Sequence, residues 1–349
     1  ELARDRLPAG LSLRDLGEHR LKDLVRPERI FQLAGADLKT DFPPLKSLDV
    51  LPNNLPAQLT SFVGRAAEIA EAKSLLGATR LLTLTGSGGT GKTRLSLQVA
   101  AEALADFADG VWLVELAPLA DPDRVAAAVA AIFDVRDQPG RTMLEQLQDY
   151  LRTRQVLLVL DNCEHLIAAS ARVADALVRA CPRVKVLASS REALGLAGER
   201  IFHVPSLGLP DARAALDVIG QSEAVQLFVE RAAAAQPRFS LNEQNAGAVG
   251  EICRRLDGIP LAIELAAARI RLFAPEQIAS RLNDRFKLLT GGSRTALPRQ
   301  QTLRALIDWS YDLLPESEKA LLRRVSVFAG GWTFEAAEAV CDSDDLLDA

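Results

Sequence analysis

The stretch TGSGGTGKT at residues 85–93 constrains the fold more than any other part of the sequence. It fits the pattern GxxxxGK[ST], with Gly86 first and Lys92 and Thr93 last. Glycines let the backbone turn tightly and direct several N–H groups into one concavity, and a helix that starts there adds its positive end. The apolar run RLLTLTG (80–86) predicts a strand before the loop, and residues 92–107 predict a helix after it. The stretch is therefore predicted to bind phosphate groups.

The residue types in this loop also predict separate roles. Lys92 supplies a point charge for the outer phosphates, and the hydroxyl of Thr93 is a Mg²⁺ ligand. The predicted phosphate-binding residues are Gly86, Ser87, Gly88, Gly89, Thr90, Gly91, Lys92 and Thr93.

Strand-like and helical segments alternate from about residue 60 to residue 209. Further strands are predicted at 110–117, 156–162, 183–192 and 199–205, with helices near 121–134 and 141–154 between them. This alternation predicts an α/β fold, in which helices cover both faces of a parallel sheet. Residues 222–290 are predicted to be helical throughout, and residues 300–341 suggest three more helices.

The run VLLVLDN (156–162) ends a buried strand with an acid. We expect the Asp161 carboxylate to lie beside the loop and to complete the Mg²⁺ site, directly or through water. Asn162 follows where many ATPases have a second acid, and an amide cannot take a proton. If a base activates water, Glu164 is the better candidate. His165 is also near, and a turn histidine is its simpler interpretation.

Arg191 closes the next strand, in VLASSR. An arginine there can reach a γ-phosphate or respond to its absence. A solvated arginine is the alternative. Ser189 and Ser190 are weaker candidates for the same site.

Five motifs now stand in order: FVGR (62–65) with Glu68, the glycine loop, VLLVLDNCEH (156–165), LASSRE (187–192) and GIPLA (258–262). In this order they resemble the signal-transduction ATPases with numerous domains (STAND), close to the NB-ARC and AfsR-LuxR regulator branch. The resemblance runs from about residue 58 to 341.

The resemblance implies ATP or ADP with Mg²⁺ as ligands. It places Val63, Gly64 and Arg65 around the adenine and ribose, Pro260 against the base, and Arg191 as the phosphate sensor. It also makes residues 301–340 similar to a winged-helix domain. That family often has a later histidine that touches the β-phosphate, and none follows His203 here.

The N-terminal run LGEHRLKDLVRPERIFQL resembles the last strands of class III adenylate or guanylate cyclase domains. Leu11, Leu13 and Leu16 predict a strand, Gly17 a turn or bulge, and ERIFQLA (28–34) a second strand. No cyclase metal-binding aspartate can be placed here, so cyclase chemistry is not expected of this chain. The expected parts are a cyclase remnant (1–33), a linker (34–57), a P-loop NTPase domain (58–209), a helical domain (210–295) and a winged-helix domain (296–349). The end of the given sequence can truncate the last of these domains.

The composition of the chain limits the functional classes and the cellular location that we expect. The 349 residues carry a net charge of −5, which argues against a chain that mainly coats nucleic acid. No stretch approaches 18 uncharged apolar residues, and the start lacks a signal peptide and an initiator Met. Four separated cysteines are typical of buried thiols in a reducing cytosol. We therefore expect a cytoplasmic protein that is a piece of a larger one.

Three functions compete. The first is a nucleotide-gated switch with slow ATP hydrolysis, which self-associates in its ATP state and acts on protein partners in a multidomain regulator. The second is a turnover ATPase or kinase, which Asn162 and the lack of a lid disfavour. The third is a DNA-binding regulator that uses the winged helix. Residues 300–349 hold four Lys and Arg against ten Asp and Glu, which is the wrong balance for phosphate neutralisation.

Overall fold

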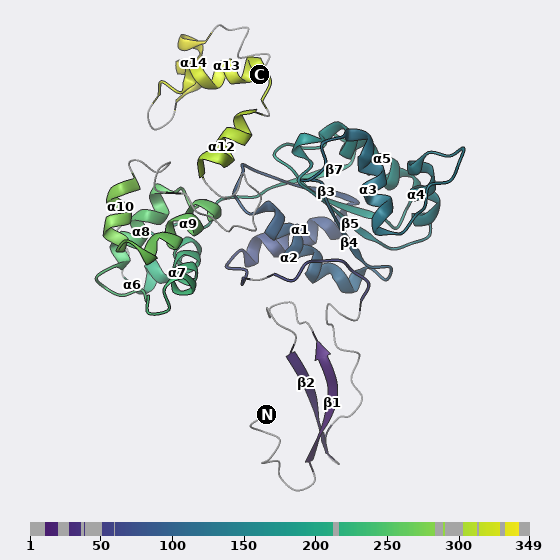
Figure 1. The fold of residues 1–349 in the computed structure, drawn as a ribbon, viewed down its shortest axis with the longest axis horizontal. Coiled ribbons are helices and arrows are strands. Elements are labelled where there is room, and N and C mark those ends of the chain that lie inside the picture. The colour runs from purple at the N-terminus through teal and green to yellow at the C-terminus, as the bar shows by residue number, and fades with distance from the viewer. Residues whose placement is uncertain are drawn as a thin grey trace. The chain divides into compact units, whose positions relative to one another are not determined.

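The computed structural model describes residues 11–19, 28–35, 38, 51–58, 60–211, 216–282, 289, 303–312, 314–328 and 332–341. The chain divides into two compact units, Glu1–Pro205 and Ser206–Ala349. Figure 1 labels the elements of both.

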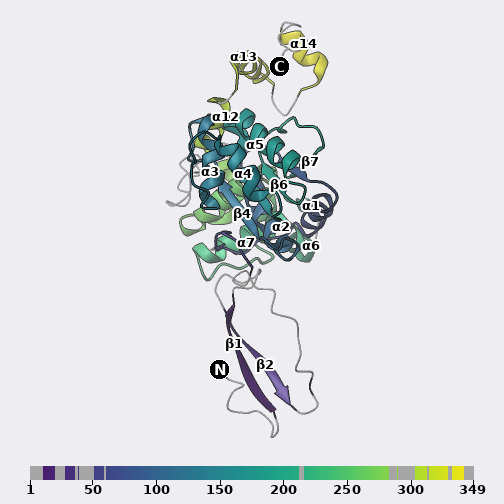
Figure 2. The same ribbon diagram turned by 90° about the vertical axis from the view of Figure 1, so that its right-hand side faces the viewer.

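The first unit contains an antiparallel pair of strands, β1 (Leu11–His19) and β2 (Glu28–Gly35), which run alongside each other in both ribbon views (Figures 1 and 2). The register shifts between Asp15 and Gly17, so the predicted irregularity at Gly17 is confirmed. An ion pair of 2.6 Å joins Asp15 to Arg29 across the strands. The similarity of this hairpin to a cyclase domain stays a prediction.

A five-stranded parallel sheet forms the centre of the first unit. Its strands lie in the order β4-β5-β6-β3-β7 and pair in parallel throughout. Their bounds are β3 (Leu81–Thr85), β4 (Val111–Glu115), β5 (Leu157–Asp161), β6 (Lys185–Ser189) and β7 (Glu199–His203). The predicted α/β fold is confirmed. Because all five strands are parallel, their carboxyl ends meet at one edge of the sheet.

Helices cover both faces of this sheet (Figure 1). Successive side chains of a strand point to opposite faces, so Leu157 and Val159 of β5 pack on one side, and Leu158 and Leu160 on the other. The first face is covered by α1 (Ala66–Ala78) and α2 (Lys92–Ala103). The second is covered by α3 (Val125–Ile132), α4 (Met143–Leu151) and α5 (Ile167–Ala180).

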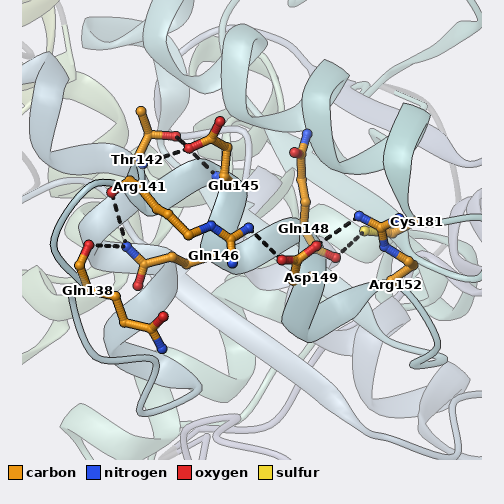
Figure 3. Close-up of polar contacts among 9 residues, drawn as sticks. All are labelled: Gln138, Arg141, Thr142, Glu145, Gln146, Gln148, Asp149, Arg152 and Cys181. Carbon is orange, nitrogen blue, oxygen red and sulfur yellow. Dashed lines mark hydrogen bonds and ion pairs between the residues drawn. The ribbon is translucent and has the colours of Figure 1, made fainter.

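A polar network fixes the start of α4 (Figure 3). Thr142 and Glu145 form a reciprocal capping box there. The buried Gln146 donates from Nε2 to the backbone oxygen of Arg141 at 3.2 Å, which holds the preceding loop against the helix. Asp149 accepts from Arg141 and Arg152 on the exposed side. None of these residues belongs to the phosphate loop, so the network serves the fold.

Residues 51–55, which the sequence assigns to the linker, lie along the edge strand β4. Asn53 forms a bridge with Val111, and the Asn54 side chain pairs with Leu113, accepting from its N–H at 2.6 Å and donating to its oxygen at 2.9 Å. Leu55 is buried in the core. This segment covers the backbone groups that an edge strand would otherwise expose.

Gly110, just before β4, gives a test of this packing. Its φ is +96°, and a Cβ there would lie 2.2 Å from the backbone oxygen of Pro52. We expect Gly110→Ala to lower the free energy of unfolding by at least about 2 kcal/mol, since it combines backbone strain with a clash. Gly140 is the matched control: its φ is +84° but nothing lies within 4 Å, so Gly140→Ala should cost about 1 kcal/mol. Equal losses in urea unfolding would contradict the close approach.

The second unit is helical in its described residues, as predicted. Its helices are α6 (Leu216–Gln221), α7 (Glu223–Ala235), α8 (Ala246–Arg255), α9 (Pro260–Ala267), α10 (Pro275–Arg281), α12 (Leu303–Asp312), α13 (Glu316–Val325) and α14 (Phe334–Val340). An ion pair of 3.0 Å between Arg231 and Glu264 joins α7 to α9. In the described residues from 303 to 341 there is no strand, and the winged helix stays a prediction.

Candidate phosphate-binding site

The glycine loop connects the end of β3 to the start of α2, as the motif requires. Gly86, Gly89 and Gly91 all have positive φ, at 147°, 82° and 88°. Gly91 is the N-cap of α2, and no side chain caps this end of the helix. The start of a helix carries backbone N–H groups and a positive dipole end that favour an anion, so this end of α2 fits a phosphate group.

The Lys92 side chain folds back onto the first residues of the glycine loop. Its ammonium donates to the backbone oxygens of Gly86 at 2.7 Å and Ser87 at 3.0 Å, and the residue is buried. A phosphate group would offer this cation stronger, charged acceptors than the two carbonyls do. The geometry therefore fits the predicted phosphate role.

Asp161 meets Thr93 at the carboxyl edge of the sheet. The Thr93 hydroxyl donates to Asp161 Oδ1 at 2.8 Å, and the Ser189 hydroxyl donates to the same oxygen. Strand β6 lies between β5 and β3, so Asp161 reaches the loop past the end of β6 and not from a neighbouring strand. Burial raises the pKa of the Asp161 carboxyl, while the hydrogen bonds from Ser189 and Thr93 oppose that shift.

These oxygens fit Mg²⁺. The ion prefers oxygen ligands, keeps several waters, and is usually held by one or two protein groups together with substrate phosphates. Thr93 and Asp161 supply such a pair beside the loop. A metal here would replace their direct hydrogen bond and relieve the buried charge of the carboxylate.

The segment after Asp161 is fixed by its own contacts. Asn162 has a φ of 68°, and its N–H donates to Ser189 Oγ at 3.0 Å. His165 bonds through Nε2 to the backbone oxygens of Leu119 at 2.8 Å and Leu116 at 3.1 Å, so this nitrogen is the donor. His165 therefore holds the turn, in line with its simpler interpretation. Burial raises the pKa of the Cys163 thiol to about 12, which makes it a poor nucleophile.

Glu164 and Arg191 lie together in the same region. Arg191 Nε is 3.7 Å from Glu164 Oε1, and the Glu164 side chain is 8% exposed. The other carboxylate oxygen, Oε2, is buried and has no hydrogen-bond partner in the described part of the chain. The two residues predicted as base and sensor are thus paired with each other. Ser190, which precedes Arg191 in the sequence, is buried, and its hydroxyl has no hydrogen-bond partner among the described residues.

Arg65 has a place that its predicted role does not explain. It is 3% exposed, and its guanidinium donates to the backbone oxygens of Thr90 in the loop and Pro205 beyond β7. Val63 and Gly64 precede it, half-buried and exposed respectively. Pro260 begins α9 in the second unit. Contacts of Val63, Gly64, Arg65 and Pro260 with a nucleotide base or ribose stay predictions.

The contacts of two of these residues, Ser189 and Arg65, were not predicted from the sequence. Ser189 was a weak candidate, yet it links Asp161 to Asn162. Its position at the end of a strand next to Asp161 was the available signal. The contact of Arg65 with the loop had no local signal, because Thr90 and Pro205 are distant in sequence.

Comparisons with known proteins show what the chain is similar to. Residues 76–196 match the AAA domain family. Rv0890c of Mycobacterium tuberculosis, whose name designates a proposed HTH-type transcriptional regulator, is 48% identical over 274 residues, which is 78% of this chain and 30% of Rv0890c. The uncharacterized protein Rv0894 of the same organism is 45% identical over 287 residues, 82% of this chain and 70% of Rv0894. The regulatory protein AfsR of Streptomyces griseus is 28% identical over 321 residues, 85% of this chain and 30% of AfsR.

Among solved structures, a STAND protein with a tetratricopeptide repeat sensor from Pyrococcus horikoshii gives a TM-score of 0.39 at 16% identity, covering 79% of this chain and 36% of that one.

The fold and the loop define a P-loop ATPase domain of the AAA type. The chain belongs to the same family as Rv0894 of Mycobacterium tuberculosis. It spans about 30% of the length of Rv0890c. In the part of the chain that the structure describes, no helix is both long and apolar enough to cross a membrane.

Proposed function

We propose that this chain is a nucleotide-gated switch of the STAND type, which binds ADP or ATP with Mg²⁺ and hydrolyses ATP slowly. In this proposal the ADP state is closed, and the ATP state is open and self-associates. The nucleotide lies on residues 86–93, with Mg²⁺ at Thr93 and Asp161. The switch works in the cytoplasm, inside a larger regulator; the names of Rv0890c and AfsR support the regulator part of this proposal.

The pairing of Glu164 with Arg191 is the observation that carries the proposal. A ligand shifts an equilibrium only by its differential affinity for the two states. ADP and ATP differ by one charged phosphate group. Because Arg191 is held by a largely buried carboxylate at 3.7 Å, a γ-phosphate would compete with Glu164 for the same cation. The site thus has a group that can tell ATP from ADP.

The pairing of Glu164 with Arg191 also argues against the hypothesis that this chain is a fast ATPase or kinase. Glu164 would have to leave Arg191 before it could accept a proton from water, and Asn162 offers no second base. A steady-state rate of about 10 s⁻¹, typical of enzymes, would revive that reading. DNA binding by this chain is disfavoured by the acidic balance of residues 300–349. Tight DNA binding that weakens steeply with salt would reverse that conclusion.

We expect a non-hydrolysable ATP analogue to increase the size of the wild-type chain in solution relative to ADP, as measured by light and X-ray scattering. Arg191→Ala should lose the increase and bind the analogue roughly tenfold to a hundredfold more weakly, the strength of one charged hydrogen bond, with little change for ADP. Arg183→Ala, before the start of β6, is the matched control, because Arg183 contacts Gln155 and Thr153 there. If the wild-type chain scattered identically with ADP and with the ATP analogue, the proposed switch would be contradicted for this chain.

A further inference from the structure

Arg65 lies at the start of α1, with a φ of 62°. Its Nη2 donates to the oxygen of Thr90 at 2.6 Å and to the oxygen of Pro205 at 2.9 Å. Thr90 belongs to the phosphate loop, and Pro205 is the last residue of the first compact unit. One buried cation therefore joins the loop to the segment by which the chain leaves the sheet.

The residue before Pro205 contacts the other end of the same loop. The Val204 N–H donates to the oxygen of Thr85 at 2.8 Å. A Cβ on Gly86 would lie 3.2 Å from the oxygen of Val204, so the two backbones are in close contact. At its start, the loop is therefore in direct contact with Val204. At Thr90, the Arg65 side chain links the loop to Pro205.

Two residues further on, the chain is fixed again within the second unit. The Leu207 N–H donates to the oxygen of Gly258 at 3.0 Å. Gly258 has a φ of +65°, and a Cβ there would lie 2.4 Å from the Leu207 oxygen. Gly258 opens the GIP motif that leads into α9. The connector 204–207, as we call these four residues, is therefore held at one end by the phosphate loop and at the other beside GIP.

We propose that Arg65 is a positioning residue, which couples the conformation of the phosphate loop to the connector 204–207. When phosphate takes Lys92 from the carbonyls of Gly86 and Ser87, the loop changes shape. The oxygen of Ser87 also accepts from the Thr90 hydroxyl at 2.9 Å, so a change at Gly86 and Ser87 can reach Thr90. Gly86 and Thr90 are the loop residues linked to the connector. Arg65 fixes the Thr90 side of that link, because a guanidinium holds its acceptors in a defined plane. This inference rests on nucleotide binding by the loop.

Amide hydrogen exchange with and without ADP tests the coupling. In the wild-type chain we expect ADP to slow exchange in both the loop (86–93) and the connector. In Arg65→Ala the loop should keep its protection, while the ADP-dependent protection of the connector falls roughly fivefold, the factor of one ordinary hydrogen bond. Arg65→Lys should restore part of it, and serves as the test variant if the alanine variant does not fold.

Arg94→Ala is the matched control. Arg94 also donates to two backbone oxygens, but these belong to Thr60 and Ser61, whereas Arg65 donates to Thr90 and Pro205. It should leave both protections unchanged. Full ADP-dependent protection of the connector in both Arg65 variants would overturn the coupling, as would wild-type protection of the loop alone. No protection of either segment in the wild-type chain would instead contradict nucleotide binding, and with it the basis of the inference.

Discussion

Lys92→Ala is expected to weaken binding of ADP and ATP by roughly 30- to 150-fold, because it removes a charged donor worth about 2–3 kcal/mol from the phosphate site. In the structure this ammonium lies within the loop on the oxygens of Gly86 and Ser87. Those carbonyls lose one donor each in the variant, so a small loss of stability is also expected. Titration calorimetry with Mg·ADP measures the first effect, and thermal unfolding the second.

Lys73→Ala is the matched control for that experiment. Lys73 pairs with Glu102 at 3.0 Å, on the helices that cover the same face of the sheet, and takes no part in the loop. Its variant should bind nucleotide like the wild type. If Lys92→Ala bound Mg·ADP within about threefold of wild type, less than one ordinary hydrogen bond, the loop would not be the phosphate site.

Asp161→Asn is expected to have opposite effects with and without ligand. Since burial raises the pKa of the Asp161 carboxyl in the folded chain, folding binds its proton more tightly. The stability linked to that proton is present at low pH and is lost as the pH rises from the unfolded pKa, about 4, through the raised folded pKa. At pH 7 without Mg²⁺, asparagine avoids the buried charge and still accepts from Thr93 and Ser189. The variant should therefore melt at or above the wild-type temperature, and the difference should vanish near pH 4.

With Mg·ATP the order should reverse. Losing a metal ligand is expected to lower Mg²⁺-dependent nucleotide affinity by roughly 10- to 100-fold, so the wild type gains more stability from the ligand. Asp149→Asn is the control: Asp149 lies on α4, is exposed, and pairs with Arg141 before the helix and Arg152 after it (Figure 3). A lower metal-free melting temperature for Asp161→Asn, with unchanged Mg²⁺ dependence, would remove Asp161 from the metal site.

The local part of the site could be predicted from the sequence. A strand, a glycine loop and a helix must lie together in space, so residues 86–93 needed no further information. The place of Asp161 beside the loop also followed from the sequence, since parallel strands bring their carboxyl ends to one edge. The reasoning was incomplete, because sequence does not show that β6 separates β5 from β3. The role of Asp161 as a metal ligand stays a prediction. That strand order is what makes Ser189 a partner of Asp161.

Contacts between segments that are distant in the chain could not be predicted from the sequence. Arg65 meets Thr90 and Pro205 across 25 and 140 residues, and His165 meets Leu116 across 49. Such contacts depend on how strands and loops pack, which no local spacing encodes. The pairing of Glu164 with Arg191 belongs to the same class. The sequence predicted Glu164 as a candidate base, and the resemblance to STAND proteins implied Arg191 as the phosphate sensor, but neither predicted that the two side chains pair with each other.

The nucleotide content of the freshly purified chain tests the central claim most directly. The chain is denatured, and the released nucleotide is identified and counted by ion-exchange chromatography, with Lys92→Ala prepared in parallel. We predict about one ADP per wild-type chain, as for a closed site with slow exchange, and much less in the variant. A wild-type chain that emerges empty, and that takes up neither Mg·ADP nor an ATP analogue on titration, would contradict the account.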